Sequence, residues 1–573
     1  MRSILHRLYG PSKGATATAR IMTVLESFMQ ENSPGRAVAF SEKDAVLITY
    51  GDTLWREGER SLHTLYRFME EYVRGMFSGV HILPFFPYSS DDGFSVTDFY
   101  AVRPELGTWA DVRKFGESYR LMVDLVVNHV SAQSVWFKNY LAGQEGFASL
   151  AIAVDPLADT SSVVRPRSLP LLTCFEKHSG EAVHLWTTFS ADQIDLNYQS
   201  LDVLENMVRV LLFYVSQGAS MIRLDAIAYL WKEIGTPSIH LPQTHQMVRL
   251  FRWILDRVAP HVALITETNV PHDENIRYFG NGQDEAQLVY NFTLGPLLLF
   301  ALASGNARTL SEWVQNLSTP TAEAMFFNFT ASHDGIGVRP LEGILASAEI
   351  ERLSDRLRRN GAYVSKRRQM DGTDAAYEFN ITYFDALREP DDPEDPLHIA
   401  RFLASQALTL TLPGIPAVYI HSLFGSRNWS AGVELTKRAR SINREKISAD
   451  IMAMALKDPR SERSRIFRSY RDLLRIRAQQ PAFHPSADAR VLFLDDRVLA
   501  LQRESRDQTL FALTNLSANR LTIALPIKRA GSRLYDCLGG GRFSAAAVTM
   551  PPYGVRWLVS RPMPGSKAPS SDP

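Results

Sequence analysis

Short apolar runs recur along most of the chain, and stretches with helical spacing separate them. Such runs predict buried strands, whereas apolar residues three and four positions apart predict amphipathic helices. The interval 200–218 shows the helical pattern, with Ser200 as the expected N-cap and Gly218 as the stop. Its apolar face is Leu204, Met207, Val208, Leu211 and Val215. The candidate strands are 45–52, 79–86, 121–130, 219–226, 261–268, 288–292, 324–334 and 415–421.

The alternation of strands and helices predicts the fold class. Eight strands that alternate with helices indicate an α/β protein with a (β/α)8 TIM barrel. A doubly wound open sheet is the alternative, but no GxGxxG motif follows the first strand.

Two intervals are too long to be simple connections, and the end of the chain changes its pattern. Long loops within compact domains usually carry function. We therefore predict a small inserted domain after strand 3 and a long charged insertion, 335–400, after strand 7, whose charges indicate a solvated helix face. Short β-rich pieces near the C-terminus predict an antiparallel β-sandwich domain. The predicted domains are the barrel (1–130 and 198–484), the inserted domain (131–197), the C-terminal β domain (485–560) and a disordered tail (561–573).

Composition and charge narrow the class of protein. The chain is 45% hydrophobic and 22% charged, with a formal net charge of zero, so no overall basic field suggests nucleic acid or an acidic membrane as a partner. The two cysteines, Cys174 and Cys537, form no CxxC motif and no disulfide framework. The N-terminus lacks the apolar segment of a signal peptide, and no segment looks able to span a bilayer. We therefore expect a soluble cytoplasmic protein.

Polar residues follow the predicted strands at their C-terminal ends, where barrel active sites lie. One strand places Arg223 and Asp225 on the same face, although burying ions is costly. A structural salt bridge is one interpretation of that pair. Three carboxylates at one barrel mouth repel each other, however, and such an arrangement favours a reaction that uses them. The candidates are Asp124, Asn128 and His129 on strand 3, Arg223 and Asp225 on strand 4, Glu267 on strand 5, and His333 and Asp334 on strand 7.

Four segments carry a resemblance to a known family. "DLVVNHVS", "IRLDAIAY", "ITETN" and "FTASHDG", in this order, resemble the diagnostic segments of the α-amylase family of retaining α-glucosidic enzymes. "QIDLN" and "LPGIPAVYIH" also fit. The resemblance implies that Asp225 is the nucleophile, Glu267 the general acid/base and Asp334 the stabiliser of the transition state. It also implies that His129 and His333 bind the glucosyl unit and that Arg223 orients Asp225.

A mechanism that retains the configuration at the anomeric carbon agrees with these roles. A retaining mechanism needs two carboxyl groups about 5–5.5 Å apart, one ionised and the other protonated. Arg223 is a cation beside Asp225, so we expect it to lower the pKa of that carboxyl group. Glu267 follows the apolar run "VALIT" without an adjacent cation, which allows a raised pKa.

Further segments are similar to sucrose-phosphorylase-like enzymes. In "PFFPYSSDDGFSVTDFYAV", Asp91 matches a residue that holds the glucose hydroxyls, and Phe94 matches the aromatic platform. "VVRPRSLPLLT" resembles a loop whose arginine, here Arg167, contacts phosphate or acceptor. "ARSINREK" places Arg440 at a glucose-binding position, and Tyr229 also matches. The alternative for Arg167 is an ordinary surface residue.

Two departures point within this subgroup to glucosylglycerate phosphorylases. Asn269 stands where sucrose phosphorylases have histidine, and "HDGIGVRPLEGIL" introduces Arg339, a plausible partner for the carboxylate of glycerate. An ion pair between Arg339 and Glu342 is the alternative. The resemblance thus implies reversible phosphorolysis of 2-O-α-D-glucosyl-D-glycerate to α-D-glucose 1-phosphate and D-glycerate.

Other functions stay open at this point. Sucrose 6′-phosphate is the second candidate substrate and sucrose the third, and a catalytically silent amylase-like binding protein is the alternative of another class. Asn128 matches a position that helps to hold calcium in amylases, but the inserted domain lacks further oxygen ligands, so we predict no required metal. We expect no cofactor besides inorganic phosphate as co-substrate, and we leave a homodimer open.

Overall fold

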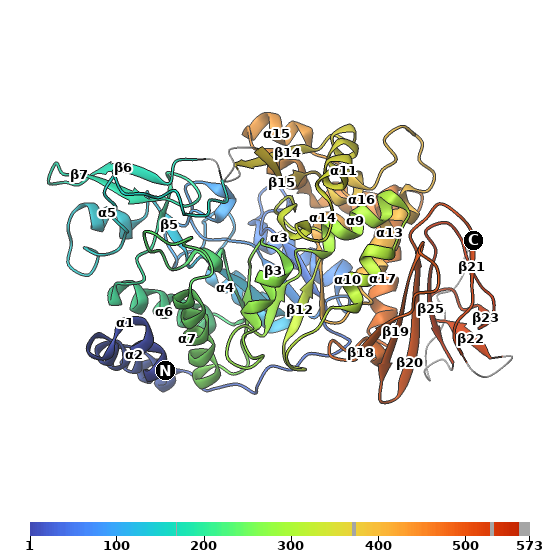
Figure 1. The fold of residues 1–573 in the computed structure, drawn as a ribbon, viewed down its shortest axis with the longest axis horizontal. Coiled ribbons are helices and arrows are strands. Elements are labelled where there is room, and N and C mark those ends of the chain that lie inside the picture. The colour runs from blue at the N-terminus through green and yellow to red at the C-terminus, as the bar shows by residue number, and fades with distance from the viewer. Residues whose placement is uncertain (168, 369–373, 528–531, 561–573) are drawn as a thin grey trace.

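The chain folds around a closed barrel of eight parallel strands (Figure 1). The structure is a computed structural model, and it describes residues 1–573 except 168, 369–373, 528–531 and 561–573. The predicted disordered tail lies outside the described residues. Neighbours around the barrel follow the order β1-β16-β12-β11-β10-β9-β4-β3. The strands are β1 (Val46–Thr49), β3 (Gly79–Ile82), β4 (Arg120–Leu125), β9 (Ala219–Leu224), β10 (Ala263–Thr266), β11 (Leu288–Tyr290), β12 (Met325–Asn328) and β16 (Ile415–Tyr419).

Each barrel strand lies within or overlaps one of the predicted apolar runs, which confirms the barrel and excludes the open sheet. The observed strands are shorter than the runs. The run 121–130 is an example, because β4 ends at Leu125 and the chain then leaves the barrel wall. It continues as β5 (His129–Ser131), which pairs antiparallel with β8 (Gln193–Asp195). This pairing holds the base of the inserted segment beside the barrel mouth.

Helices cover the outside of the barrel. In α6 (Leu201–Ser216), Ser200 is the N-cap, the predicted apolar face is buried, and Gly218 follows with a φ of 94°. The crossover from β10 to β11 contains only α8 (His272–Asn275) and the 3-10 turn η4 (Ile276–Phe279). The other helices of this layer are α3 (Ser61–Phe68), α4 (Trp109–Ser118), α7 (Pro242–Val258), α9 (Leu294–Ser304), α10 (Arg308–Gln315), α13 (His398–Thr409), α16 (Ala449–Lys457) and α17 (Glu462–Arg477).

Two insertions stand over the barrel mouth. The first contains α5 (Val135–Leu141) and the hairpin of β6 (Leu172–Glu176) and β7 (Ala182–Trp186), which projects at the upper left of Figure 1. The second contains α11 (Ser347–Arg359), whose exposed charges agree with the predicted solvated face. It also contains a sheet of β13 (Ile336–Gly337), β15 (Asp374–Asn380) and β14 (Tyr363–Arg368), in that spatial order. This sheet was not predicted, and it supplies residues of the site.

The C-terminal residues form antiparallel sheets at the right of Figure 1, as predicted. Six strands pair in the order β18-β19-β20-β25-β22-β23, and β21 pairs with β24. Apolar side chains such as Val498, Leu513 and Val548 form a core of their own. The strands are β18 (Asp488–Val491), β19 (Val498–Ser505), β20 (Gln508–Asn515), β21 (Leu521–Ile523), β22 (Arg533–Asp536), β23 (Arg542–Ser544), β24 (Val548–Met550) and β25 (Val555–Val559).

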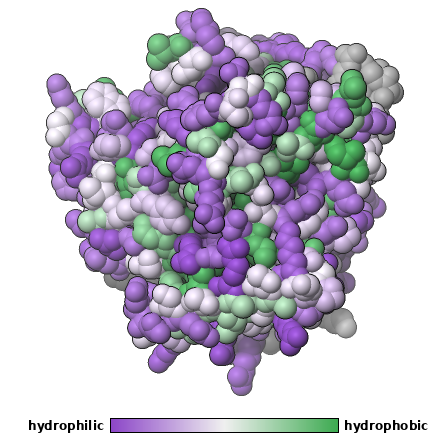
Figure 2. Space-filling view, turned by 90° about the vertical axis from the view of Figure 1, so that its left-hand side faces the viewer, coloured by the Kyte–Doolittle hydropathy of each residue, from purple (hydrophilic) through white to green (hydrophobic). Residues whose placement is uncertain are grey.

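The N-terminal helices α1 (Arg2–Tyr9) and α2 (Pro11–Glu31) pack beside α6 and α7. This side of the molecule is largely hydrophilic, with apolar residues in small groups (Figure 2). In the part of the chain that the structure describes, every helix is too short or too polar to cross a bilayer. Cys174 and Cys537 are both free thiols.

Candidate active site

The predicted polar residues meet in one cavity at the C-terminal ends of the barrel strands. Asp225 follows β9, Glu267 follows β10, and Asp334 lies in the loop after β12. Parallel strands of a barrel end at the same rim, which explains why residues far apart in sequence converge. The inner cavity is lined by Asp91, Phe94, His129, Arg167, Phe189, Gln193, Arg223, Asp225, Ala226, Glu267, Asn269, His333, Asp334, Tyr377 and Arg440.

The Arg223 guanidinium lies at the floor of this cavity and is fully buried. Its Nη1 donates to Asp225 Oδ1 at 2.8 Å and also contacts Asp124, and its Nη2 is 3.8 Å from Glu267 Oε2. The other Asp124 oxygen is 2.7 Å from His81 Nε2. One cation therefore joins three carboxyl groups, so the ion pair proposed for Arg223 exists and is part of the site.

Burial changes the expected pKa of Asp225. Desolvation raises its pKa, and although Arg223 opposes this, the nearby Glu267 and Asp124 carboxylates add to the rise. The expectation of a lowered pKa was therefore wrong, because the sequence did not reveal that Asp225 is fully buried and that Arg223 is shared. The pKa of Glu267 is also raised, mainly by burial, as expected.

Two neighbouring carboxyl groups in such a site share one proton more readily than they both ionise. Arg223 bonds directly to Asp225, whereas it lies 3.8 Å from Glu267. The direct bond favours the charge on Asp225 and the proton on Glu267. Glu267 Oε2 also accepts a hydrogen bond from the Ala226 N–H at 2.9 Å, which fixes the carboxyl group beside Asp225. Ala226 has a φ of 50°, so the turn after the strand is what directs this N–H.

Asp334 stays ionised for the opposite reason. Its Oδ1 is 2.7 Å from Arg440 Nη1 and 3.9 Å from Arg444 Nη2. The charges of Arg440 and Arg444 outweigh burial, so the pKa of Asp334 lies well below its usual range. Burial lowers the pKa of His333 to about 3, so its ring is neutral at ordinary pH. The ring stacks on Phe94 with centroids 4.9 Å apart.

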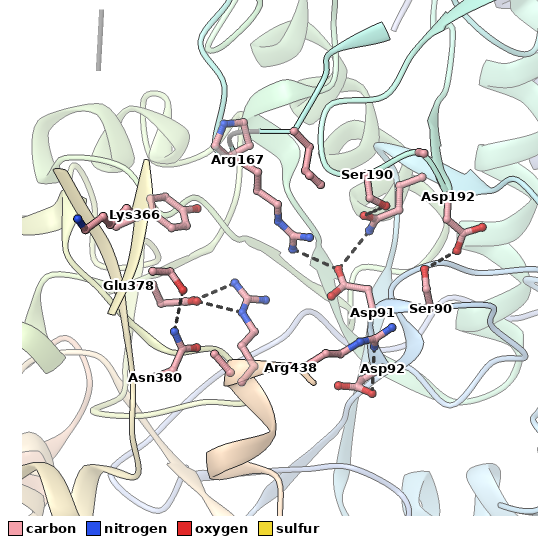
Figure 3. A pocket seen from close by; sticks show the side chains of 18 of the residues that line it. Ser90, Asp91, Asp92, Arg167, Ser190, Asp192, Lys366, Glu378, Asn380 and Arg438 are labelled. Carbon is pink, nitrogen blue, oxygen red and sulfur yellow. Dashed lines mark hydrogen bonds and ion pairs between the residues drawn. The ribbon is translucent and has the colours of Figure 1, made fainter. Parts of the chain in front are cut away.

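Two consecutive aspartates at the cavity wall point in different directions. Asp91 and Asp92 have φ values of 56° and 49°, in the left-handed region that costs energy for residues with a Cβ. Asp91 Oδ2 faces Arg167 Nη2 at 3.4 Å and accepts from Gln193 Nε2 at 3.2 Å (Figure 3). Asp92 instead binds Arg444. The strained turn thus places one carboxylate in the inner cavity and keeps the other behind it.

A wider cavity of about 600 Å³ lies outside the inner one (Figure 3). The side chains that line both form a neck, which consists of Asp91, Arg167, Gln193, Tyr377 and Arg440. The neck carries two guanidinium groups, and it lies between the outer cavity and the inner one.

Glu378, from β15, organises one side of the neck. This carboxylate is almost fully buried and accepts from Arg440 Nε at 3.1 Å and Nη2 at 2.8 Å. It also accepts from the Gly335 N–H at 3.1 Å, next to Asp334. A Cβ at residue 335 would lie 2.4 Å from the Glu378 Cγ, so this contact requires glycine. Neither Glu378 nor Tyr377 could be recognised from sequence, because both lie in the charged insertion.

Asp192, in the inserted segment, bonds to serines of the neighbouring cavity wall. It accepts hydrogen bonds from Ser89 at 2.5 Å and Ser95 at 2.7 Å, and it also contacts Ser90 and Ser131. The loop after β3 is thereby fixed to the inserted segment. Other residues missed from sequence are Phe189, Gln193 and Arg444, although "QIDLN" and "ARSINREK" contain two of them.

Two predicted residues lie outside both cavities. Tyr229 packs edge-on against Phe189, with ring centroids 5.5 Å apart, and Arg339 lies near Tyr229. Neither is among the described side chains that line the inner or the outer cavity. Arg339 is 4.0 Å from Glu274, whereas Glu342 pairs with Arg367 at 2.5 Å. Contact of Arg339 with a substrate therefore stays a prediction, whereas the alternative pairing with Glu342 was wrong.

A buried ammonium group lies at the base of the inserted segment. Lys232 Nζ is 2.7 Å from Asp195 Oδ2 and 2.6 Å from Asn128 Oδ1. Lys232 thereby links Asn128, which follows β4, to Asp195 in β8. Among the described residues, no group of three or more His, Cys, Asp or Glu side chains is arranged to hold a metal ion.

The fold and the site define a class of protein: a closed (β/α)8 barrel with adjacent carboxyl groups in a cavity at its mouth, an arrangement typical of retaining enzymes that act on glycosidic bonds. Comparisons with known proteins agree. Residues 71–337 match the model of the α-amylase catalytic domain, and residues 495–558 match the C-terminal immunoglobulin-like domain of D-apionate lactonase. The chain belongs to the α-amylase family, in its group of sucrose-phosphorylase-like glucoside phosphorylases.

The relatives are similar over nearly the whole chain. The glucosylglycerate phosphorylase of Allomeiothermus silvanus is 46% identical over 96% of this chain and 97% of its own. That of Escherichia coli is 43% identical over 97% of this chain and 98% of its own. The crystal structure of sucrose 6F-phosphate phosphorylase from Thermoanaerobacter thermosaccharolyticum superposes with a TM-score of 0.74 at 26% identity, over 86% of this chain and 97% of that chain.

Proposed function

We propose that this protein is a retaining glucosylglycerate phosphorylase. It converts 2-O-α-D-glucosyl-D-glycerate and phosphate to α-D-glucose 1-phosphate and D-glycerate, reversibly. The observation that carries the proposal is the cationic neck, where Arg167 and Arg440 stand directly outside a pair of carboxyl groups. Guanidinium groups suit both phosphate and carboxylate oxygens, and this reaction brings one of each to the same place in turn.

The first half-reaction uses both carboxyl groups. Asp225 attacks the anomeric carbon as its carboxylate, and a covalent glucosyl-enzyme forms. The bond to the glycerate oxygen breaks, and Glu267 donates its proton to that oxygen. Arg223 holds Asp225 in line at 2.8 Å, and the Ala226 N–H fixes Glu267. In the second half-reaction, phosphate attacks the same carbon from the side that glycerate left, the bond to Asp225 breaks to release its carboxylate, and Glu267 takes a proton from the phosphate.

The remaining residues bind and orient. We propose that Phe94, His129 and His333 enclose the glucosyl ring and that Asp91 and Asp334 accept hydrogen bonds from its hydroxyl groups. Arg440, held by Glu378, keeps Asp334 in place. When a glucose hydroxyl engages Asp91, the 3.4 Å contact between Asp91 and Arg167 is exchanged for one between Arg167 and the incoming anion.

The acceptor contacts are proposed from the neck. Arg167, Asn269 and Tyr377 line the inner cavity and are placed to meet the phosphate or the glycerate carboxylate. Arg339 stays in the proposal as a charge behind the wall, where a low dielectric extends its attraction for an anion. Tyr229 supports that wall through Phe189.

The wider setting is also part of the proposal. We expect no metal and no organic cofactor, a cytoplasmic location, and no nucleic-acid or membrane partner. A homodimer is tested by light scattering.

A donor screen with inorganic phosphate tests the function. Glucosylglycerate, sucrose 6′-phosphate and sucrose are each incubated with the enzyme, and glucose 1-phosphate is measured. We expect glucosylglycerate to be the best donor and the product to be the α anomer. A preference for sucrose 6′-phosphate would move the assignment to that substrate, and no turnover of any donor would favour a silent binding protein.

Two variants test the roles of the carboxyl groups. Asp225→Asn should abolish phosphorolysis with the fold intact, and a variant with near wild-type turnover would exclude Asp225 as nucleophile. Glu267→Gln should slow glucosylglycerate far more than α-glucosyl fluoride, because fluoride leaves without protonation. Equal losses with both donors would exclude the acid role.

A further inference from the structure

A separate cavity of about 220 Å³ lies behind the inner one, and we call it the rear cavity. Its wall contains Asp92 and Arg444, which separate it from the residues around Asp334. None of the residues that line the inner cavity lines it. The rear cavity is lined by Tyr50, Gly51, Asp52, Pro84, Tyr88, Asp92, Arg103, Leu106, Trp429, Thr436, Ser441, Arg444 and Lys446.

Several residues that line this cavity have a buried hydrogen-bond donor without an acceptor among the described residues. The Tyr50 hydroxyl is buried and has no hydrogen-bond partner among the described residues. Arg444 Nη2 and Arg103 Nε are also buried and have no hydrogen-bond partner among the described residues. Asp334 lies 3.9 Å from Arg444 Nη2, and Glu105 lies 3.7 Å from Arg103 Nε. Unsatisfied buried polar groups are rare, and several around one cavity indicate a ligand that accepts hydrogen bonds.

The charges of the rear cavity favour an anion. Its lining has three cations, Arg103, Arg444 and Lys446, and two carboxylates, Asp52 and Asp92. Asp52 is shared between Arg103, at 2.8 Å, and Lys446. The lining therefore carries one positive charge in excess. Guanidinium and ammonium groups with free donors bind small oxyanions through charge-assisted hydrogen bonds.

Arg444 connects this cavity with the active site. Its Nε donates to the His333 carbonyl oxygen at 2.7 Å, and its Nη2 lies between the rear cavity and Asp334. The Tyr50 ring meets the His333 ring edge-on, with centroids 5.9 Å apart. An anion held by Arg444 and Tyr50 would thus contact the residues that support His333 and Asp334 from behind.

We propose that the rear cavity is a second oxyanion site, which takes a small anion such as inorganic phosphate or the carboxylate of a hydroxy acid. Arg444, Lys446, Arg103 and the Tyr50 hydroxyl donate to it. The anions are chosen from the proposed function, but binding itself does not depend on turnover.

Equilibrium dialysis of the full-length protein with radiolabelled inorganic phosphate tests the proposal. Wild type should bind two phosphates per chain, one at the neck and one in the rear cavity. Lys446→Met should bind one, because the excess charge is lost while Arg103 still pairs with Asp52. Arg167→Ala should also bind one, at the rear cavity. Lys457→Met, an exposed lysine at the end of α16, is the matched control and should bind two.

Tyr50→Phe separates a specific site from a general effect of charge. It removes one oxygen atom and keeps the ring beside His333, so folding is unaffected. In the Arg167→Ala background it should weaken phosphate binding about tenfold, the value of one hydrogen bond to an ion. Binding unchanged by Tyr50→Phe, or two phosphates bound by Lys446→Met, would overturn the proposal. So would a wild type that binds a single phosphate.

The Arg167→Ala variant also distinguishes inorganic phosphate from a hydroxy acid as the anion of the rear cavity. If unlabelled D-glycerate displaces phosphate from Arg167→Ala, the rear cavity accepts hydroxy acids as well. If it does not, the site is one for phosphate. Failure of the donor screen would leave these binding results intact, so the two proposals fail independently.

Discussion

Replacing Glu378 by glutamine tests whether the insertion after strand 7 takes part in the reaction. Glu378 accepts two hydrogen bonds from Arg440, at 3.1 and 2.8 Å, and Arg440 Nη1 meets Asp334 at 2.7 Å. In Glu378→Gln, an amide donor replaces one of the accepting oxygens and faces the donors of the guanidinium. Arg440 then shifts toward Asp334, and the orientation of that carboxylate against the sugar is lost.

The size of the effect follows from the contacts. At least one charge-assisted hydrogen bond is lost, worth about 1.5–3 kcal/mol. If this loss is felt in the transition state, kcat falls by about ten- to a hundredfold. The lining of the outer cavity beside the neck also loses one negative charge, so the KM for phosphate should not rise. A fall in kcat without a rise in KM is therefore the expected signature of a positioning residue.

Initial rates of phosphorolysis at varied phosphate measure both constants. Glu342→Gln is the matched control, because Glu342 belongs to the same insertion but pairs with Arg367 nearer the surface, with 39% of its side chain exposed. It should stay within about twofold of wild type, as surface ion pairs contribute little. Thermal melting of both variants reports on folding. A wild-type kcat in Glu378→Gln, or an equal loss in both variants, would refute the reasoning.

Three further predictions concern charge. Lys232→Met should destabilise the protein by about 3–5 kcal/mol, seen as a lower melting temperature, because Asp195 loses its buried counter-ion; a chelator should leave wild type unchanged, and a lowered melting temperature would point to a bound metal instead. Burial lowers the pKa of His421 from 6.5 to about 3, so the unfolded chain binds a proton below pH 6.5 and the folded chain does not. As the pH falls from 6.5 toward 3, the free energy of unfolding should therefore fall by about 1.4 kcal/mol per pH unit. His421→Gln should flatten this slope in urea unfolding at pH 7 and pH 5, and an unchanged slope would contradict the assignment. Arg167→Ala should raise the KM for phosphate by about ten- to a hundredfold in initial-rate measurements, and an unchanged KM would remove Arg167 from the anion site.

The sequence alone determined the barrel and the centre of the site. Periodicity reveals which runs are buried strands, and the residues that follow them share one rim because parallel strands close into a ring. Asp225, Glu267 and Asp334 were therefore found together without a structure. Eleven of the thirteen predicted site residues line the inner cavity. Boundaries were less accurate, as in 121–130, because the end of β4 depends on the pairing of His129 with Asp195.

Only the tertiary structure decided what depends on burial and on distant segments. Glu378 comes from an insertion whose local pattern is that of a charged surface, and its role appears only where β15 meets Arg440. The pKa of Asp225 follows from full burial and from a cation shared by three carboxyl groups. Neither can be recognised from the proximity of Arg223 and Asp225 in the sequence. Arg339 is not among the described residues that line either cavity, because proximity in sequence to Asp334 does not fix the direction of a side chain. The local sequence pattern thus predicts the helices and strands, whereas contacts between distant segments determine the pKa values and ion pairs of the site.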